Sequence, residues 1–285
     1  MTSSVSVPTR VVLINDRGPE SDDVTRVLRR EASQSPGEFE IVTNSRNLGL
    51  VGSLNTFLSA EKRAGTDVLI VNSDVSMAAG SIEEMRRILR VDSQTGIVCP
   101  RSNNASIASV DGLDIGSVAS ATASFLSWSR NVPESTLVPV AVGFCMLIRG
   151  ELFDEFGYFD PIYSPGYGEE NDFSYRIRRG GWQVRLANRA FAFHVGRASF
   201  GTSRGELLQM RNEIIFRFRY PIYTFDIDRY QRSVKRRQTT GQPAERFGGW
   251  IFSFTKQLVF TMFRPIPTLG ARCVLAVRRL VTVRL

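Results

Sequence analysis

The segment Gly166–Arg179, which reads GYGEENDFSYRIRR, has the strongest chemical character in the chain. Glu169, Glu170 and Asp172 fall within four consecutive positions, just where a helical pattern begins. Carboxylates at the start of a helix, behind a glycine-containing loop, suit a catalytic base that faces a cleft. The helix dipole alone also favours an acidic first turn, so this interpretation needs support from other parts of the chain.

The N-terminal half alternates short apolar runs with amphipathic patterns. Such alternation is typical of βαβ units and predicts an α/β fold with a mostly parallel sheet flanked by helices. In the segment Ser81–Val91, Glu84 follows Ser81 by three residues, which is the spacing of a capping box at the start of a helix. We expect strands at Arg10–Asn15, Phe39–Thr43 and Asp67–Val71, and helices at Asp22–Glu31, Gly52–Arg63 and Ser81–Val91.

Polar residues follow each of these three strands. They are Asp16, Asn47 and the run Asn72–Asp74. Open parallel sheets bind ligands beyond the carboxyl ends of their strands, so these residues are expected on one rim. Polar residues are also common at strand ends without any functional role. That alternative explains each of these residues taken singly, but it explains the occurrence of all three less well.

The second half is less regular. We expect irregular structure over Val91–Leu137 and an apolar strand at Val138–Ile148, with Gly143 in its middle, where glycine permits a close approach. A glycine- and proline-rich loop at Tyr158–Gly168 precedes the acidic helix. Beyond it we expect strands at Gln183–Ala187 and Ala190–His194, a helix at Ser203–Arg219, a polar linker at Arg232–Glu245, and amphipathic helices at Phe247–Phe263 and Thr268–Val283.

His194 is the only histidine, which excludes a metal site built from several histidines. The sequence also has no nucleophile elbow, no P-loop and no glycine fingerprint after the first strand. A lone histidine is usually structural, and Asp74 alone could be a turn residue. A carboxylate, an imidazole and a bound diphosphate together would nevertheless suit a hard divalent ion, since Mg²⁺ commonly takes only one or two protein ligands.

The positive charge is confined to the C-terminal part. The 285 residues carry a net charge of +8, whereas Arg229–Leu285 alone contain twelve Lys or Arg and one acid, giving +11. A nucleic-acid-binding protein would more often carry its basic stripe on the folded domain. A basic, apolar tail favours an anionic membrane surface instead, although helices that dock on a protein core are an equal alternative.

The cysteines and the hydropathy of the chain argue against a disulfide-rich, a zinc-binding or a membrane-spanning protein. Cys99, Cys145 and Cys273 are widely spaced, which indicates neither a disulfide framework nor a zinc site and favours a reducing cytosol. We find no signal-peptide pattern and no apolar run long enough for a membrane span. We therefore expect a cytoplasmic protein, peripheral at the inner face of the cell membrane.

These features together resemble a family 2 glycosyltransferase with a GT-A fold, of the rhamnosyltransferase-like kind. The resemblance covers roughly residues 10–225, in family order. The matching segments are IND (Ile14–Asp16), RNLGLVGSLN (Arg46–Asn55), LIVNSDV (Leu69–Val75), VGFCMLIRGELFDEFGYFD (Val142–Asp160), GYGEENDFSYRIRRGGW (Gly166–Trp182) and FAFHVGRASFG (Phe191–Gly201).

The resemblance implies a role for each candidate residue. Asp74 matches the metal-binding end of the family's DxD motif, and His194 matches the histidine that joins the metal–diphosphate site. Glu170 stands at the position of the general base. The remaining assignments are nucleotide contacts for Asp16, Asn47 and Asn72, and acceptor or sugar contacts for Glu169, Asp172 and Gly143.

The implied function is inverting, metal-dependent transfer of a hexosyl or rhamnosyl group, with Mg²⁺ or Mn²⁺. The donor would be a nucleotide-diphosphate sugar, and the acceptor a growing cell-wall polysaccharide or a lipid-linked glycan. We expect a glycosyltransferase domain at residues 1–228 and a basic helical tail at 229–285 that meets an anionic membrane, with no nucleic-acid partner.

The resemblance also implies a strand and helix ahead of Val11 that this sequence does not show. The family places that strand in the middle of its sheet. An alternative function is therefore a weakly active or inactive relative that binds nucleotide or glycan without turnover. A second alternative is a basic nucleic-acid-binding or membrane-scaffold protein that acts through its tail.

Overall fold

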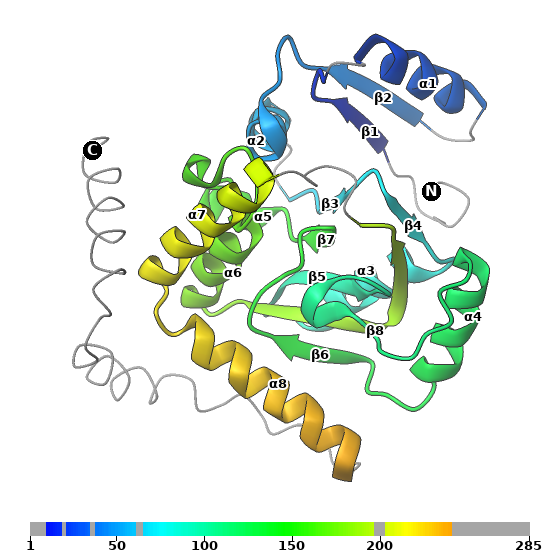
Figure 1. Cartoon of the computed structure of the whole chain (residues 1–285), viewed down its shortest axis with the longest axis vertical. Helices are drawn as coiled ribbons and strands as arrows, with labels where there is room; N and C mark the ends of the chain where they lie inside the picture. The colour runs from blue at the N-terminus through cyan, green and yellow to red at the C-terminus, as the bar shows by residue number, and fades with distance from the viewer. Residues whose placement is uncertain (1–9, 19–20, 35–37, 61–64, 197–202, 241–285) are drawn as a thin grey trace. The chain divides into compact units, whose positions relative to one another are not determined.

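The computed structural model describes residues 10–18, 21–34, 38–60, 65–196 and 203–240 (Figure 1). The chain divides into two compact units, Met1–Gln209 and Met210–Leu285. The predicted tail helices after residue 240, and the end of the motif at residues 191–201, lie outside the described residues. The boundary at residue 229 stays a prediction.

The first unit contains all the described strands, arranged in two sheets. β1 and β2 pair in parallel, and the larger sheet has the order β3-β7-β5-β8-β4, with β6 paired to β8. β5 and β8 run parallel, whereas the other pairs of the larger sheet are antiparallel. The strands are β1 (Arg10–Asn15), β2 (Glu38–Thr43), β3 (Val68–Val71), β4 (Val75–Met77), β5 (Thr95–Arg101), β6 (Ser135–Val138), β7 (Cys145–Ile148) and β8 (Gln183–His194).

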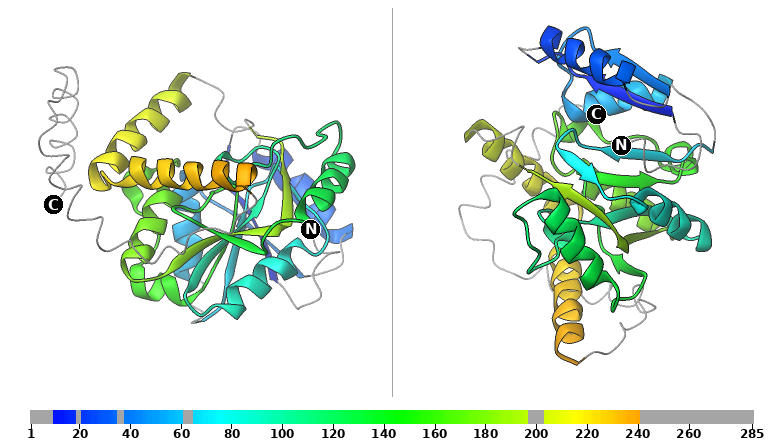
Figure 2. Two further views of the ribbon diagram at one scale, coloured as in Figure 1. Left: turned by 90° about the horizontal axis from the view of Figure 1, so that it is seen from below. Right: turned by 90° about the vertical axis from the view of Figure 1, so that its right-hand side faces the viewer.

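Within the first unit, helices α1, α3, α4 and α6 pack against the strands, which confirms the α/β fold class (Figure 2). The predicted helix boundaries agree closely for α3 and α7. The helices are α1 (Ser21–Gln34), α2 (Gly49–Ala60), α3 (Ser81–Val91), α4 (Val118–Ser129), α5 (Glu151–Phe156), α6 (Glu169–Arg179), α7 (Ser203–Arg219) and α8 (Tyr223–Thr240), with short 3₁₀ turns at Ser106–Ala108 and Pro161–Tyr163.

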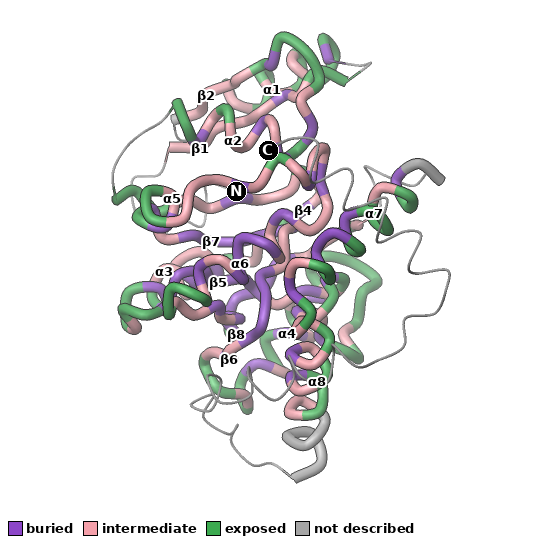
Figure 3. The backbone as a smooth tube through the Cα atoms, turned by 90° about the vertical axis from the view of Figure 1, so that its left-hand side faces the viewer, coloured by how far each residue is buried: buried purple, intermediate pink, exposed green. Residues whose placement is uncertain are grey.

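The core of the first unit lies around β5, β7 and β8 (Figure 3). All four residues of β7, six of the seven in β5 and seven of the twelve in β8 are buried. Burial on both faces explains why β7 and the middle of β5 read as continuous apolar runs rather than as alternating patterns. Phe125 of α4 stacks on Phe191 of β8, with ring centroids 4.7 Å apart. This packing fixes the strand that ends at His194.

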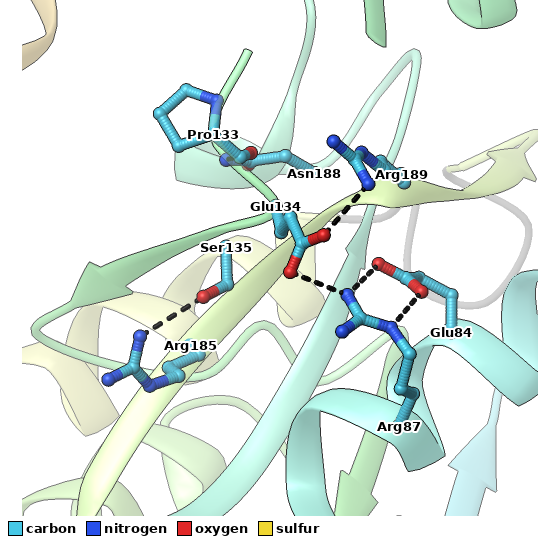
Figure 4. Close-up of polar contacts among 8 residues, drawn as sticks. All are labelled: Glu84, Arg87, Pro133, Glu134, Ser135, Arg185, Asn188 and Arg189. Carbon is cyan, nitrogen blue, oxygen red and sulfur yellow. Dashed lines mark hydrogen bonds and ion pairs between the residues drawn. The ribbon is translucent and has the colours of Figure 1, made fainter. Parts of the chain in front are cut away.

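A surface network holds the entry of β6 against β8 and α3 (Figure 4). Arg87 binds Glu84 and Glu134 at 2.8 and 2.9 Å, and Arg189 binds Glu134 at 2.9 Å. Asn188 donates a hydrogen bond to the carbonyl of Pro133. Hydrogen bonds and charge from Arg87 lower the pKa of Glu134, so this carboxylate stays ionised and paired.

The small β1–β2 sheet is joined to the larger one through α2. Asn55 makes two hydrogen bonds with the backbone of Phe159, and the amide of Val51 donates to the carbonyl of Pro165. Among the described strands, none pairs with the second edge of β1 or of β3. The extra strand that the resemblance implies stays a prediction.

Several local predictions are wrong, and the first three of them fail because long-range contacts decide the local conformation. Val91–Leu137 contains β5, α4 and the start of β6 in place of irregular structure. The apolar run Val138–Ile148 is interrupted, so that Gly143 lies between β6 and β7. Ser81 does not cap α3, because its hydroxyl bonds the backbone of Phe191. The expected linker after Arg232 begins as helix, since α8 extends to Thr240. No helix in the described ranges is long and apolar enough to cross a membrane.

Candidate active site

Asp74 and His194 meet where β4 pairs with the end of β8. Val75 lies opposite His194 in the antiparallel register, and the amide of Val195 donates to the carbonyl of Asp74 at 3.1 Å. The imidazole Nε2 of His194 lies 3.4 Å from Oδ2 of Asp74. Two residues 120 positions apart in the sequence therefore present a ring nitrogen and a carboxylate oxygen to the same point.

Two asparagines that the sequence analysis did not assign hold His194 in place. Asn103 accepts a hydrogen bond from the His194 amide at 2.8 Å and donates one to its carbonyl at 3.1 Å. Nδ1 of His194 lies 2.7 Å from the carbonyl oxygen of Asn104 and must donate to it. The pair of asparagines directly after β5 was the only sequence signal for this contact.

This geometry fits a divalent cation. Because Nδ1 donates to the carbonyl of Asn104, Nε2 is the ring nitrogen that faces the Asp74 carboxylate. A cation between the two would bind the Nε2 lone pair and the carboxylate oxygen together. A ring N–H donated to a backbone carbonyl is the usual second contact of a metal-binding histidine. The described residues contain no cluster of three or more metal-ligating side chains, so diphosphate and water would complete the coordination.

The segment Val142–Phe144 links this pair to the carboxylate helix. The ring of Phe144 stacks on the ring of His194, with centroids 5.0 Å apart. The carbonyl of Phe144 accepts a hydrogen bond from the amide of Asn72 at 2.8 Å. Directly beside it, Gly143 packs against Glu170, since a Cβ on Gly143 would lie 3.5 Å from the carboxyl carbon of Glu170. The adjacent residues Gly143 and Phe144 therefore contact Glu170 on one side and His194 and Asn72 on the other.

Glu170 begins α6, and its Oε2 accepts a hydrogen bond from the amide of Gly168 at 3.2 Å. Burial raises the pKa of Glu170, which brings this carboxylate closer to the basicity that proton abstraction at neutral pH requires. The thiol of Cys99, which lies near Glu170, is no competing nucleophile because burial raises its pKa to about 12.

The other two acids of α6 are buried. Asp172 is fully buried and accepts a hydrogen bond from Arg176 at 2.9 Å, which favours a structural role. Glu169 is 3% exposed, and its Oε2 has no hydrogen-bond partner among the described residues. Burial, followed by the charge of Glu170, raises the pKa of Glu169 to about 8.

The predicted nucleotide residues Asp16 and Asn47 lie in the β1–β2–α2 part of the unit. Oδ1 of Asp16 accepts hydrogen bonds from Asn44, the amide of Leu48 and the hydroxyl of Ser53, all within 2.8 Å. The side-chain oxygen of Asn47 accepts a hydrogen bond from the amide of Gly49 at 3.2 Å. Both side chains therefore shape the loop before α2.

That loop contacts the loop that precedes α6. Gly49 has φ of +71°, and a Cβ at this position would lie 2.3 Å from the side chain of Pro165, so only glycine fits. This contact joins the predicted nucleotide side to the loop ahead of Glu170. No hydrogen bond or ion pair between Asp16 or Asn47 and the Asp74–His194 pair is seen in the described residues.

The fold and the comparisons with known proteins define a glycosyltransferase of the GT-A class. The sequence profile of glycosyl transferase family 21 matches residues 18–206, and the chain belongs to that family. The motifs had indicated family 2, so the family number is corrected, whereas the glycosyltransferase class is confirmed. No curated protein sequence matches the chain.

Two solved structures illustrate the fold. GalNAc-T7 with UDP, GalNAc and Mn²⁺ has a TM-score of 0.52 and 15% identity, over 73% of this chain and 42% of that one. The mannosyltransferase PcManGT from Pyrobaculum calidifontis, in complex with GDP-Man and Mn²⁺, has a TM-score of 0.50 and 15% identity, over 73% of this chain and 53% of that one. The chain thus spans about half the length of these proteins, and at this identity the likeness concerns the fold.

Proposed function

We propose that this protein is an inverting glycosyltransferase that moves a sugar from a nucleotide-diphosphate donor to a hydroxyl group of a glycan or lipid-linked acceptor. The observation that carries the proposal is the link through Val142–Phe144. Phe144 contacts His194 of the cation pair, and the adjacent Gly143 contacts Glu170, the candidate base. Donor activation and acceptor deprotonation would therefore take place on neighbouring residues.

Glu170 would remove the proton of the acceptor hydroxyl as the hydroxyl oxygen bonds to the anomeric carbon. The bond from that carbon to the diphosphate oxygen breaks on the opposite face, which inverts the configuration, and the electron pair leaves with the diphosphate. Gly143 leaves room for the Glu170 side chain, because a Cβ at this position would already be in van der Waals contact with that carboxyl group at 3.5 Å and a bulkier side chain would displace it.

Asp74 and His194 would hold a divalent ion, Mg²⁺ or Mn²⁺, which supplies charge neutralisation for the departing diphosphate. Both solved structures named above were obtained with Mn²⁺ and a nucleotide or nucleotide sugar. Asn103 and Asn104 would keep the imidazole in the tautomer that offers Nε2. Asp16 and Asn47 would order the loop that meets the nucleotide, with Asn72 beside the diphosphate.

A rhamnosyl or hexosyl donor, a cell-wall polysaccharide acceptor, and a cytoplasmic location at the inner membrane face belong to the same proposal. They rest on the motif resemblance and on the charge of Arg229–Leu285, which is +11. The second candidate function is binding without turnover. It is favoured by the division of the described strands into two sheets, in which β1 and β2, next to the predicted nucleotide loop, pair with no described strand of the larger sheet.

The test is donor hydrolysis and transfer across a panel of nucleotide sugars with Mn²⁺, comparing the wild type with Glu170→Gln. We expect the wild type to turn over at least one donor. The variant should lose transfer and keep donor binding, as measured by thermal shift. Near-normal turnover by Glu170→Gln would show that Glu170 is not the general base. Tight donor binding without turnover by the wild type would favour the second candidate function, binding without turnover.

A further inference from the structure

The segment Pro139–Phe144, between β6 and β7, contains both residues that link the two halves of the candidate site, yet it belongs to no helix or strand. Side chains of other elements hold its backbone. Arg178 of α6 donates a hydrogen bond to the carbonyl of Pro139 at 2.8 Å. Sγ of Cys99, in β5, accepts a hydrogen bond from the amide of Val142 at 3.4 Å. The position of this segment therefore depends on contacts with α6 and β5 rather than on regular structure.

Between these two contacts, Ser174 of α6 joins the segment to Glu170. Ser174 is fully buried. Its hydroxyl donates a hydrogen bond to the carbonyl of Glu170 at 2.6 Å and accepts one from the amide of Ala141 at 2.9 Å. A serine hydroxyl often bonds the carbonyl four residues earlier in a helix, but the second bond reaches a residue 33 positions away in the sequence. One hydroxyl thus connects the helix to the segment.

This connection lies next to the contact between Glu170 and Gly143. Ala141 precedes Gly143 by two residues, and a Cβ on Gly143 would lie 3.5 Å from the carboxyl carbon of Glu170. Ala141 is 2% exposed, and a buried amide that loses its hydrogen bond is costly. Without the Ser174 hydroxyl, the segment would therefore move to give this amide another partner, and the packing of Gly143 on Glu170 would change.

We propose that Ser174 is a positioning residue for sugar transfer, whose hydroxyl sets where the Glu170 carboxylate meets the acceptor hydroxyl. The proposal rests on the function proposed above, in which Glu170 is the general base. Misplacement of a reacting group by about 1 Å lowers a rate by about 100-fold. The cation residues Asp74 and His194 lie beside β4 and at the end of β8, so turnover should depend on Ser174 more than donor binding does.

The test compares the wild type with Ser174→Ala, Ser174→Cys and a matched control, Thr136→Val. Thr136 is 4% exposed, and its hydroxyl accepts a hydrogen bond from the side chain of Asn188 at 2.8 Å, so the control also removes a buried hydroxyl. We expect Ser174→Ala to lower kcat for transfer by about tenfold or more and to keep the donor KM within about twofold. Thr136→Val should keep the wild-type kcat.

Ser174→Cys should recover part of the lost kcat. A thiol is a weak donor and a weak acceptor, and a thiol of this chain, that of Cys99, already accepts a hydrogen bond from the neighbouring amide of Val142. A purely structural role would instead lower kcat in Ser174→Ala and in Thr136→Val alike, or would raise the donor KM as much as it lowers kcat.

Amide hydrogen exchange over residues 139–144 of the full chain, without donor or acceptor, tests the contact itself. Exchange should be faster in Ser174→Ala than in the wild type and unchanged in Thr136→Val. The proposal is overturned if exchange or kcat in Ser174→Ala equals that of the wild type, or if Thr136→Val loses as much kcat. A wild type that turns over no donor would overturn the proposed function and the role of Ser174 in transfer with it, whereas the exchange data would still decide whether Ser174 holds the segment.

Discussion

Nε2 of His194 lies 3.4 Å from Oδ2 of Asp74, while Nδ1 of the same ring is held by the carbonyl of Asn104 at 2.7 Å. The amide of Gly196 donates to the same Asp74 oxygen at 3.1 Å. The imidazole is therefore fixed on one side and open toward a carboxylate on the other. This arrangement favours a metal-binding role for His194. From the sequence context alone, that role could not be distinguished from a structural one.

Asp74→Asn and His194→Ala are each expected to abolish the stabilisation that Mn²⁺ and a nucleoside diphosphate give together. Each variant removes one of the two protein ligands that converge in the site, and a ligand that binds only the folded state raises its melting temperature by mass action. The measurement is thermal unfolding with Mn²⁺ and a panel of nucleoside diphosphates. Asp111→Asn, which changes an exposed loop acid, serves as the control and should respond as the wild type does. An unaltered Mn²⁺ response in His194→Ala would show that the ring is structural.

Gly143 tests the contact between the two halves of the site. Gly143→Ala should be nearly neutral, since its Cβ would meet Glu170 at an ordinary 3.5 Å. Gly143→Val adds two methyl groups in the same space and should displace the Glu170 carboxyl group, lowering transfer by about 100-fold, as misplacement of a reacting group by about 1 Å does. The ratio of kcat between the two variants checks this, with circular dichroism as the test of folding. Equal kcat values for alanine and valine would mean that Glu170 does not react where it lies.

The sequence predicted the α/β class and several helix boundaries because their signals are local. Ser203–Arg219, for example, is bounded by a serine and by the approach to Pro221. The strands of the second half were harder to predict. The apolar run Val138–Ile148 reads as one strand, yet Val138 pairs with β8 whereas Cys145 pairs with β3, so the chain must turn between them at Gly143.

The candidate site was partly predictable for the same reason. Asp74 and Glu170 stand at element ends, where sequence patterns are informative. The contribution of Asn103 and Asn104 depends on the register of β8 against β5, in which Arg101 lies opposite Phe191 after a shift. No spacing in the sequence encodes that register. The buried state of Glu169 likewise depends on packing around α6 rather than on its own neighbours in the chain.

The pH dependence of stability should report on Glu169. Its pKa of about 8 in the folded protein exceeds the ordinary value of 4.5, so the folded state binds this proton more tightly than the unfolded chain does. The free energy of unfolding should therefore fall as the pH rises from 4.5 to 8, by up to about 1.4 kcal/mol per pH unit, and level off above 8. Glu169→Gln should flatten this slope.

Urea unfolding of the wild type and of Glu169→Gln across that pH range measures the slope directly. The control, Asp154→Asn, removes an exposed carboxylate from α5 and should keep the wild-type slope. If Glu169→Gln and the wild type have parallel profiles, then Glu169 is ionised in the folded protein, and its Oε2 must have a partner.

Ser81 should matter for stability although it does not cap a helix. It is 2% exposed, and its hydroxyl both donates to the carbonyl of Phe191 at 3.0 Å and accepts from the amide of Phe191 at 2.9 Å. Ser81→Ala would take the Ser81 hydroxyl away from the buried amide of Phe191, whereas the Phe191 carbonyl would keep its hydrogen bond from the amide of Ala78 at 2.9 Å. We expect a loss of about 1–3 kcal/mol in the free energy of unfolding. Ser59→Ala is the matched control, because the exposed Ser59 hydroxyl bonds only the carbonyl of Thr56 in its own helix. Denaturant unfolding compares the two variants, and the anchoring role of Ser81 is wrong if both lose the same small amount. Because this anchor lies three residues before His194, Ser81→Ala should also weaken the Mn²⁺ response, whereas Ser59→Ala should leave it unchanged.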